Sequence, residues 1–374
     1  MNEAKVQESQ ELQEARGQQM KEQKALVSFY VTPHRTLIFW LDAHTATPQV
    51  DHVDIEQAEI AAAAAELQRL FSYRHIHARR PEYTTDMAWL VPLGRKLLQP
   101  LADRLTRCKA MIVAPHAELH LLPFHLLVGE DGIPLGVTHS ITYVANLSIY
   151  ALLLTRAIDT QDFMIPSLCM STAAQGEDSV IRETFAANPR AFAEKTQGMF
   201  LQGTDASWST FQYFAERADS LYISCHGHFD SADPLESALL LSDGKTLPSK
   251  PPADIMPYSL SVRDILNMRI RSRLVVLDAC TSGNEIFSTG DEPMGFPTAF
   301  LLSGANAVIA TNWVVERNRG RYFMTNLVER WLSGVSLGVA MQYAYVTTHE
   351  KYPHPFHWAA FSLFGNDRLL FRQN

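Results

Sequence analysis

The feature that most constrains the fold is a short apolar run, Leu274 to Leu277, which stops at Asp278-Ala279-Cys280. Aliphatic and β-branched residues without polar alternation are typical of a strand covered on both faces, as in a parallel α/β sheet. Cys280 then lies at the carboxyl end of that strand, where ligands bind in open α/β sheets. The alternative is a buried structural thiol, because cysteine is among the most buried residue types.

A second apolar strand begins at Ser220 and ends at Cys225-His226-Gly227, 54 positions before Cys280. This spacing leaves room for one crossover helix, predicted at 260–268, between two adjacent parallel strands. The histidine and the cysteine then project from neighbouring strand ends, where a histidine raises the thiolate fraction and protonates the leaving group. The backbone N–H groups of Gly227 and Cys280 are candidates for an oxyanion hole.

Strand alternation separates the two cysteines of this region. Adjacent side chains of a strand point to opposite faces, so Cys225 is predicted to face the core if His226 faces the site.

Several short segments of the chain, taken in their order along the sequence, match a pattern known from one protein family. They are Met111–Phe124, Cys225–Phe229, Pro234–Leu241 with Asp243-Gly244, Leu277–Gly283, Gly290–Gly295, Ala299–Ala305, Val308–Trp313 and His357–Gly365. In these segments the chain resembles the CHAT family of caspase-like and separase-like cysteine peptidases of clan CD. The resemblance covers nearly everything after residue 25.

The resemblance implies a caspase-like, doubly wound α/β fold with a mainly parallel sheet. A non-catalytic half, 25–160, would pack on a catalytic half, 161–374. It also implies a cysteine endopeptidase that acts on a protein partner through His226 and Cys280, without a cofactor. Two alternatives remain: a catalytically idle scaffold that retains the fold, and another cysteine hydrolase or acyltransferase on a related sheet.

Asp278 is the main candidate for substrate recognition, because the residue two before the nucleophile commonly lines the specificity pocket in caspase-like folds. Many CHAT sequences carry serine there. An aspartate is similar to the metacaspase and paracaspase pattern, in which it receives arginine or lysine. The alternative is that Asp278 holds a loop through backbone hydrogen bonds. Asp291, Glu292 and Trp313 are further substrate-binding candidates.

The composition bounds the class of protein. The chain has 374 residues, 47% hydrophobic and 19% charged, with a formal net charge of −8. No apolar stretch is long enough to span a membrane, and Met1–Lys5 does not start a signal peptide, so a cytoplasmic protein is expected. An acidic chain also argues against nucleic acid as the main partner. The four cysteines form no metal-ligand pairs and favour a reducing compartment.

Residues 1–24 are rich in Glu, Gln and Lys and predict a solvated helix or a frayed tail, with a regulatory partner-binding helix as the alternative. From residue 25 strands and helices alternate, which is typical of a doubly wound sheet. The expected strands are 26–31, 36–41, 111–114, 141–144, 164–171 and 307–311, besides those ending at His226 and Cys280. The expected helices are 54–71, 85–105, 178–195, 210–219, 295–303, 319–332 and 336–348, and the clearest loop is Ser171–Asp178.

The histidines of the N-terminal half do not predict a metal site. His116-Ala117-Glu118-Leu119-His120 differs from the His-Glu-x-x-His pattern of zinc peptidases, in which the glutamate follows the first histidine directly. Pro115 and Pro123 also crowd this segment. No third ligand can be argued for His75, His77, His354 or His357, so no metal is expected.

Overall fold

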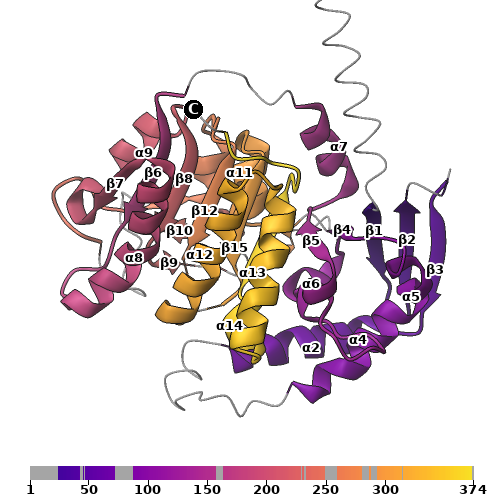
Figure 1. The fold of residues 1–374 in the computed structure, drawn as a ribbon. Coiled ribbons are helices and arrows are strands. Elements are labelled where there is room, and N and C mark those ends of the chain that lie inside the picture. The colour runs from indigo at the N-terminus through magenta and orange to yellow at the C-terminus, as the bar shows by residue number, and fades with distance from the viewer. Residues whose placement is uncertain are drawn as a thin grey trace, which may run out of the picture.

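The computed structural model describes residues 24–42, 45, 47–71, 87–156, 163–228, 230, 233–248, 259–279, 286–287, 293–313 and 315–372. Within these ranges eleven strands form one mostly parallel sheet, in the order β3-β2-β1-β4-β5-β16-β15-β12-β8-β6-β7. Strands from before residue 160 form one end of the sheet and strands from after it form the other (Figure 1). The predicted α/β class with a mainly parallel sheet is confirmed.

The N-terminal end of the sheet is an antiparallel meander followed by two parallel strands. Alternating burial along β1 and β2 turns residues such as Val27 and Ile38 into the core, and the apolar face of α2 packs there through Ile60 and Leu67. The predicted hairpin is confirmed, with Lys24 already in the first strand. The elements are β1 (Lys24–Val31), β2 (Thr36–Asp42), β3 (Gln49–Val53), α2 (Gln57–Leu70), β4 (Ala110–Ala114), η3 (Ala117–Leu121), η4 (Phe124–Leu126), α6 (Leu135–Thr138), β5 (Ser140–Tyr143) and α7 (Leu147–Thr155).

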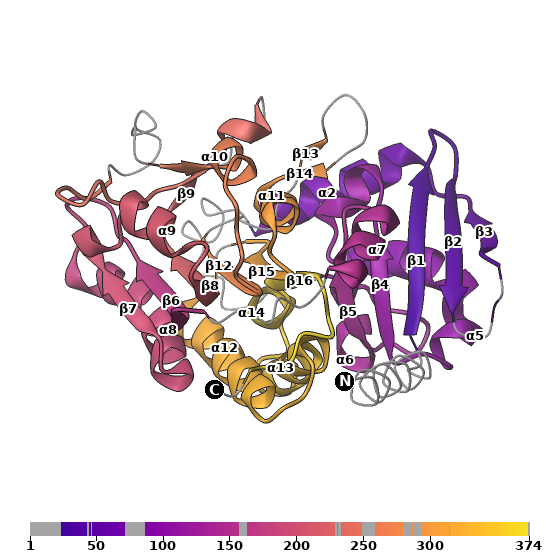
Figure 2. The same ribbon diagram turned by 90° about the horizontal axis from the view of Figure 1, so that it is seen from above.

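The C-terminal end is doubly wound, and nearly every residue of its central strands is buried, as expected for strands covered on both faces. Helices α8, α12 and α13 lie on one face of the sheet, and α10 and α11 lie on the other (Figure 2). The elements are β6 (Ile165–Ser171), α8 (Ser179–Thr196), β7 (Met199–Gln202), η5 (Gly203–Asp205), α9 (Trp208–Phe214), β8 (Ala218–Ser224), α10 (Val262–Leu266), β12 (Leu274–Asp278), α11 (Phe296–Ser303), β15 (Ala307–Thr311), α12 (Arg317–Leu332), α13 (Leu337–Lys351), α14 (Pro355–Trp358) and β16 (Phe361–Gly365).

Short strands form two smaller sheets. They are β9 (Gly227–His228), β10 (Ala238–Leu239) and β11 (Leu260–Ser261) in one, and β13 (Ile286–Phe287) with β14 (Pro293–Met294) in the other.

The two ends of the large sheet meet where β16 lies between β15 and β5. This strand runs antiparallel to β15 and parallel to β5, with Phe364 opposite Tyr143. Buried His125 bridges the junction: its Nε2 lies 2.9 Å from the Ala359 carbonyl oxygen and its Nδ1 lies 2.9 Å from the Tyr143 hydroxyl. Burial lowers the pKa of His125 to about 4, so the ring is neutral, with Nε2–H donating and Nδ1 accepting.

The helix predicted over 85–105 is wrong as one continuous element. Thr85 and Asp86 lie outside the described residues, and the remainder is four short pieces: η1 (Ala88–Leu90), α4 (Val91–Leu98), η2 (Gln99–Leu101) and α5 (Ala102–Leu105). Pro92 and Pro100 fall in the first turns of α4 and η2. Proline has no N–H to donate, so it is tolerated at the start of a helix and interrupts a longer one.

A buried ion pair joins the amino ends of β8 and β12. Arg273, the residue before β12, donates to both carboxylate oxygens of Asp219, at 2.5 and 2.7 Å. The two side chains are 7% and 9% exposed. If the strands slipped, each buried charge would lose its partner, and its desolvation penalty would no longer be compensated. The ion pair therefore favours the register that places Arg273 beside Asp219.

Arg273→Met should therefore lower the free energy of unfolding by about 3–5 kcal/mol, because it leaves the Asp219 carboxylate buried without its partner. Urea denaturation measures the loss. The exposed pair Lys195–Glu329 provides the control, and Lys195→Met should cost less than about 1 kcal/mol.

The double variant Asp219→Leu, Arg273→Met removes both charges together and should be more stable than Arg273→Met alone. If the single and double variants were equally unstable, packing rather than charge would explain the loss.

Candidate active site

The site is organised by the pairing of β8 with β12. These strands are adjacent and parallel, in register from Ser220 opposite Leu274 to Ser224 opposite Asp278, which confirms the predicted arrangement. His226 follows Ser224 by two residues, and Cys280 follows Asp278 by two. Cys280 lies outside the described residues, as do the candidates Asp291 and Glu292.

His226 lies at the carboxyl end of β8 with its side chain 20% exposed. Its Nε2 is 2.9 and 3.0 Å from the two carboxylate oxygens of Glu177, a residue of the loop between β6 and α8. The Phe185 ring, on α8, meets the imidazole edge-on with centroids 4.8 Å apart. His226 is thus held between a carboxylate and an aromatic ring that belong to one segment of the chain.

Glu177 is the residue that the sequence interpretation missed. Its side chain is only 5% exposed, and its Oε2 also accepts a hydrogen bond from the Ala174 N–H at 2.8 Å. The sequence identifies this stretch as a loop, yet it gives no signal that one acidic residue of the loop contacts a histidine 49 positions later.

Asp278 ends β12 on the same face as Tyr222 and Ser224 of β8. Its Oδ2 accepts hydrogen bonds from the Asn188 side-chain amide at 3.0 Å and from the Tyr222 hydroxyl at 3.3 Å. Burial raises the pKa of Asp278, although these two hydrogen bonds oppose the shift. Both partners are neutral groups, so the described residues supply this carboxylate with hydrogen bonds but with no counter-charge.

Ser224 adds an unsatisfied hydroxyl next to Asp278. Its Oγ is buried and has no hydrogen-bond partner within the described part of the chain. Buried polar atoms are nearly always paired, so an unpaired one beside a reactive strand end is a candidate contact for a ligand.

Gly227 lies in β9, the strand that directly follows His226. The Leu240 N–H donates to the His226 carbonyl at 2.9 Å, and Leu239 is the residue opposite Gly227. In an antiparallel pair this pattern makes Gly227–Leu239 a non-hydrogen-bonded pair, so the Gly227 N–H points away from β10. The strand pairing thus leaves the Gly227 N–H unused, and its role as an oxyanion-hole donor stays a prediction.

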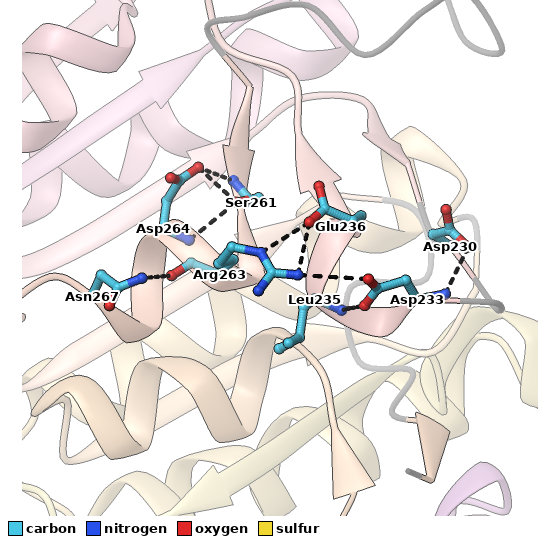
Figure 3. A network of polar contacts seen from close by, with 8 residues as sticks. All are labelled: Asp230, Asp233, Leu235, Glu236, Ser261, Arg263, Asp264 and Asn267. Atoms are coloured by element: carbon cyan, nitrogen blue, oxygen red, sulfur yellow. Dashed lines mark hydrogen bonds and ion pairs between the residues drawn. The ribbon is translucent and has the colours of Figure 1, made fainter.

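The small sheet around β9 is braced by a polar network (Figure 3). Arg263 of α10 forms ion pairs with Glu236 at 2.9 Å and Asp233 at 3.5 Å, both next to or within η6 (Pro234–Glu236). Ser261 and Asp264 form a capping box that starts α10. The network ties the segment after His226 to the helix that precedes β12.

The remaining predicted residues occupy varied positions. Cys225 is fully buried, as strand alternation predicts. Trp313 is 4% exposed, donates from its indole nitrogen to the Phe356 carbonyl and packs against Phe71. It forms part of the packing between α2 and α14, and its contact with a substrate stays a prediction.

The histidines near β4 have structural contacts. His116 Nδ1 accepts from the Val31 N–H at 3.1 Å, and burial lowers the pKa of His120 to about 3. Within the described ranges no group of three or more His, Cys, Asp and Glu side chains is placed to hold a metal ion, and no helix there is long and apolar enough to cross a membrane.

A family model, the CHAT domain, matches residues 89–366. The chain belongs to the CHAT domain family. Two relatives of this CHAT protein are Tetratricopeptide repeat protein 28 of Homo sapiens and of Mus musculus, 30% and 31% identical over 133 residues. The match covers 34% of the chain but only 5% of either relative.

The fold is similar to that in two crystal structures of the Saccharomyces cerevisiae separase–securin complex. The TM-scores are 0.59 and 0.52 at 12% identity, and each match covers 96% of this chain and 31% of the other. At this identity the likeness establishes the fold alone. The CHAT protein therefore has the caspase-like fold of separase.

Asp278→Asn should stabilise the protein at neutral pH. The folded-state pKa of Asp278 is raised, so wild-type stability falls as pH rises through the unfolded-state value, about 3.9, towards the folded-state one. Asparagine stays neutral and keeps an acceptor for Asn188 and Tyr222. The gain in Tm should therefore be present at pH 7 and should vanish below about pH 3.9.

Asp243→Asn is a control of opposite sign. The exposed Asp243 carboxylate accepts from the backbone N–H groups of Thr246 and Lys245, which lower its pKa. Its stabilising contribution is present above the unfolded-state pKa and is lost on acidification, so this variant should be less stable at neutral pH. A gain for Asp278→Asn that did not change with pH would exclude the burial of charge as its cause.

Proposed function

We propose that this CHAT protein is a cysteine endopeptidase that cleaves a protein partner, with Cys280 as the nucleophile and His226 as its proton acceptor and donor. The observation that carries the proposal is the register of β8 and β12. Ser224 lies opposite Asp278. In the sequence, His226 comes two residues after Ser224, and Cys280 comes two residues after Asp278. The CHAT family and the caspase-like fold support the same pairing.

In the proposed reaction the Cys280 thiolate attacks the scissile carbonyl carbon, and the oxyanion accepts hydrogen bonds from the N–H groups of Gly227 and Cys280. The protonated His226 then gives its proton to the leaving amine, which leaves an acyl-enzyme. Water hydrolyses the acyl-enzyme with His226 as the base.

We also propose cleavage after arginine or lysine, with Asp278 at the base of the specificity pocket. The support is that Asp278 is desolvated and that the described residues supply it with two neutral hydrogen-bond donors and no counter-charge. A cationic side chain would supply that charge in a medium of reduced dielectric. The Ser224 hydroxyl on the same face, which no described residue engages, is a further donor or acceptor for such a group.

The protein partner is proposed from similarity. The structural relatives are a complex of separase with securin, and the curated relatives are named for tetratricopeptide repeats, a class of repeat with extended concave binding surfaces. Residues 1–24 are the segment that we propose to contact a regulatory partner. A reducing compartment such as the cytoplasm would keep the catalytic thiol active.

An idle scaffold with the same fold is the competing function, and a thiol-directed probe separates the two. Native protein should react at Cys280 with an arginyl acyloxymethyl ketone and should cleave fluorogenic arginyl peptides. Cys280→Ala should abolish both, and His226→Ala should slow cleavage by on the order of 10²- to 10⁴-fold. Cys225→Ser is the matched control: it alters a buried thiol beside the histidine, so it should keep activity while losing some stability. Equal labelling of native and Cys280→Ala protein would favour the scaffold.

Asp278→Asn tests the substrate preference. It should weaken cleavage of Arg and Lys peptides by about 2–5 kcal/mol, the cost of losing one member of a buried charge pair. The rate of Cys280 alkylation by iodoacetamide, which is small and uncharged, should not change. A positional peptide library that showed turnover after acidic or apolar residues, with Arg and Lys ignored, would return Asp278 to a structural role.

A further inference from the structure

We propose that Glu177 is the positioning residue of His226: it fixes the imidazole in the productive tautomer and orientation and stabilises its protonated form. The site would then work as a Cys280–His226–Glu177 triad rather than as a pair. The inference rests on the proposed function and identifies a residue that sets the activity of that same site.

The contact fixes which ring nitrogen does the chemistry. Both carboxylate oxygens of Glu177 lie within hydrogen-bond distance of His226 Nε2, at 2.9 and 3.0 Å. An ionised carboxylate only accepts hydrogen bonds, so Nε2 carries the proton, and in the neutral ring Nδ1 has the lone pair. Among the described residues Nδ1 has no hydrogen-bond partner. On the proposed function, Nδ1 is then the atom that takes the proton of the Cys280 thiol.

The carboxylate is held in place before any substrate arrives. Its Oε2 accepts from the Ala174 N–H at 2.8 Å, and the Glu177 N–H donates to the Ala174 carbonyl at 3.3 Å. The next residue, Asp178, caps α8 by accepting from the Ile181 N–H at 2.8 Å. The same helix presents Phe185 to the imidazole. Glu177 and the ring are thus fixed by one rigid segment, as an orienting group requires.

Other titratable groups near the strand ends do not take this role. Asp278 on β12 is engaged by Asn188 and Tyr222, and His228 lies two residues on in β9. Of the charged side chains in the described part of the chain, the one in hydrogen-bond contact with His226 is Glu177. A mostly buried carboxylate attracts an imidazolium more strongly than a solvated one does, because the effective dielectric is lower there.

The protons and electrons of the proposed reaction balance without any change in the charge of Glu177. The thiol proton passes to Nδ1, and the thiolate electron pair forms the C–S bond while the carbonyl π pair moves to oxygen. When the intermediate collapses, the C–N bond breaks and Nδ1–H protonates the leaving amine. Glu177 stays ionised and stabilises the imidazolium that exists between these two transfers.

The test is Glu177→Gln, which keeps the size of the side chain and an acceptor but removes the charge. It should reduce kcat/KM for arginyl peptides by about 10- to 100-fold, from the usual strength of a hydrogen bond to a charged group, with KM little changed. Cys280 alkylation by iodoacetamide, followed by mass spectrometry as a function of pH, should require a higher pH than in the wild-type protein, because the imidazolium that accompanies the thiolate loses the stabilising carboxylate. Glu177→Asp, which restores the charge, should restore part of the lost kcat/KM and part of the wild-type alkylation profile. The control is Glu183→Gln on α8, whose carboxylate pairs with Arg190, and it should behave as wild type.

The two readouts separate this inference from the proposed function. If Glu177→Gln shows the wild-type alkylation profile and full turnover, the positioning role is wrong while the peptidase stands. If native protein alkylates rapidly through a Glu177-dependent profile yet cleaves no peptide, the peptidase fails and the positioning role stands. If all Glu177 variants lose activity together with their thermal transition, and Asp restores neither, the residue is only structural.

Discussion

The parallel pairing of β8 with β12 is the constraint on which the rest of the site depends. Their ladder runs from Ser220 opposite Leu274 to Ser224 opposite Asp278, and the buried Arg273–Asp219 ion pair closes it at the amino end. Side chains alternate between the two faces of a strand, so a slip of one residue would turn Asp278 away from the face that carries Tyr222, Ser224 and Asn188. An interaction at one end of the strands thus determines which side chains meet at the other.

The N-terminal half contributes to this site by completing the sheet. Without it, β16 would be an exposed edge, a position from which strands pair with other chains. Instead β5 pairs with β16, and His125 joins Tyr143 of one half to Ala359 of the other within a buried cluster. Because β16 is the antiparallel neighbour of β15, and β15 in turn pairs with β12, this junction supports the strand that carries Asp278. The two ends of the sheet are therefore joined both by strand pairing and by a buried side-chain bridge.

Sequence patterns predicted the buried strands well and the contacts between distant segments poorly. An apolar run such as Leu274–Leu277 is constrained by burial on both faces, which leaves a signature in the residues themselves. The strand β7 is an edge strand with half-buried residues and was not predicted, and β16 was noted as a family segment but not as a strand. The contact of Glu177 with His226 depends on how one loop returns to a strand 49 residues later, and no periodicity encodes that. The predicted helix over 85–105 failed for a local reason, two prolines, that the sequence displayed.

The two carboxylates of the site differ in how their charge is compensated, and this difference follows from their neighbours. Glu177 contacts an imidazole that can become a cation, so its charge is balanced within the protein. Among the described residues Asp278 accepts hydrogen bonds from an amide and a phenol and meets no cation, and burial raises its pKa. Burying a carboxylate that lacks a counter-charge costs stability, and such costs concentrate at functional sites. On the proposed function the two carboxylates have different roles. Glu177 is paired in the free enzyme and orients the imidazole, while the charge of Asp278 is neutralised by the substrate. The same desolvation that destabilises Asp278 in the free protein is what would make its attraction for a cationic side chain strong.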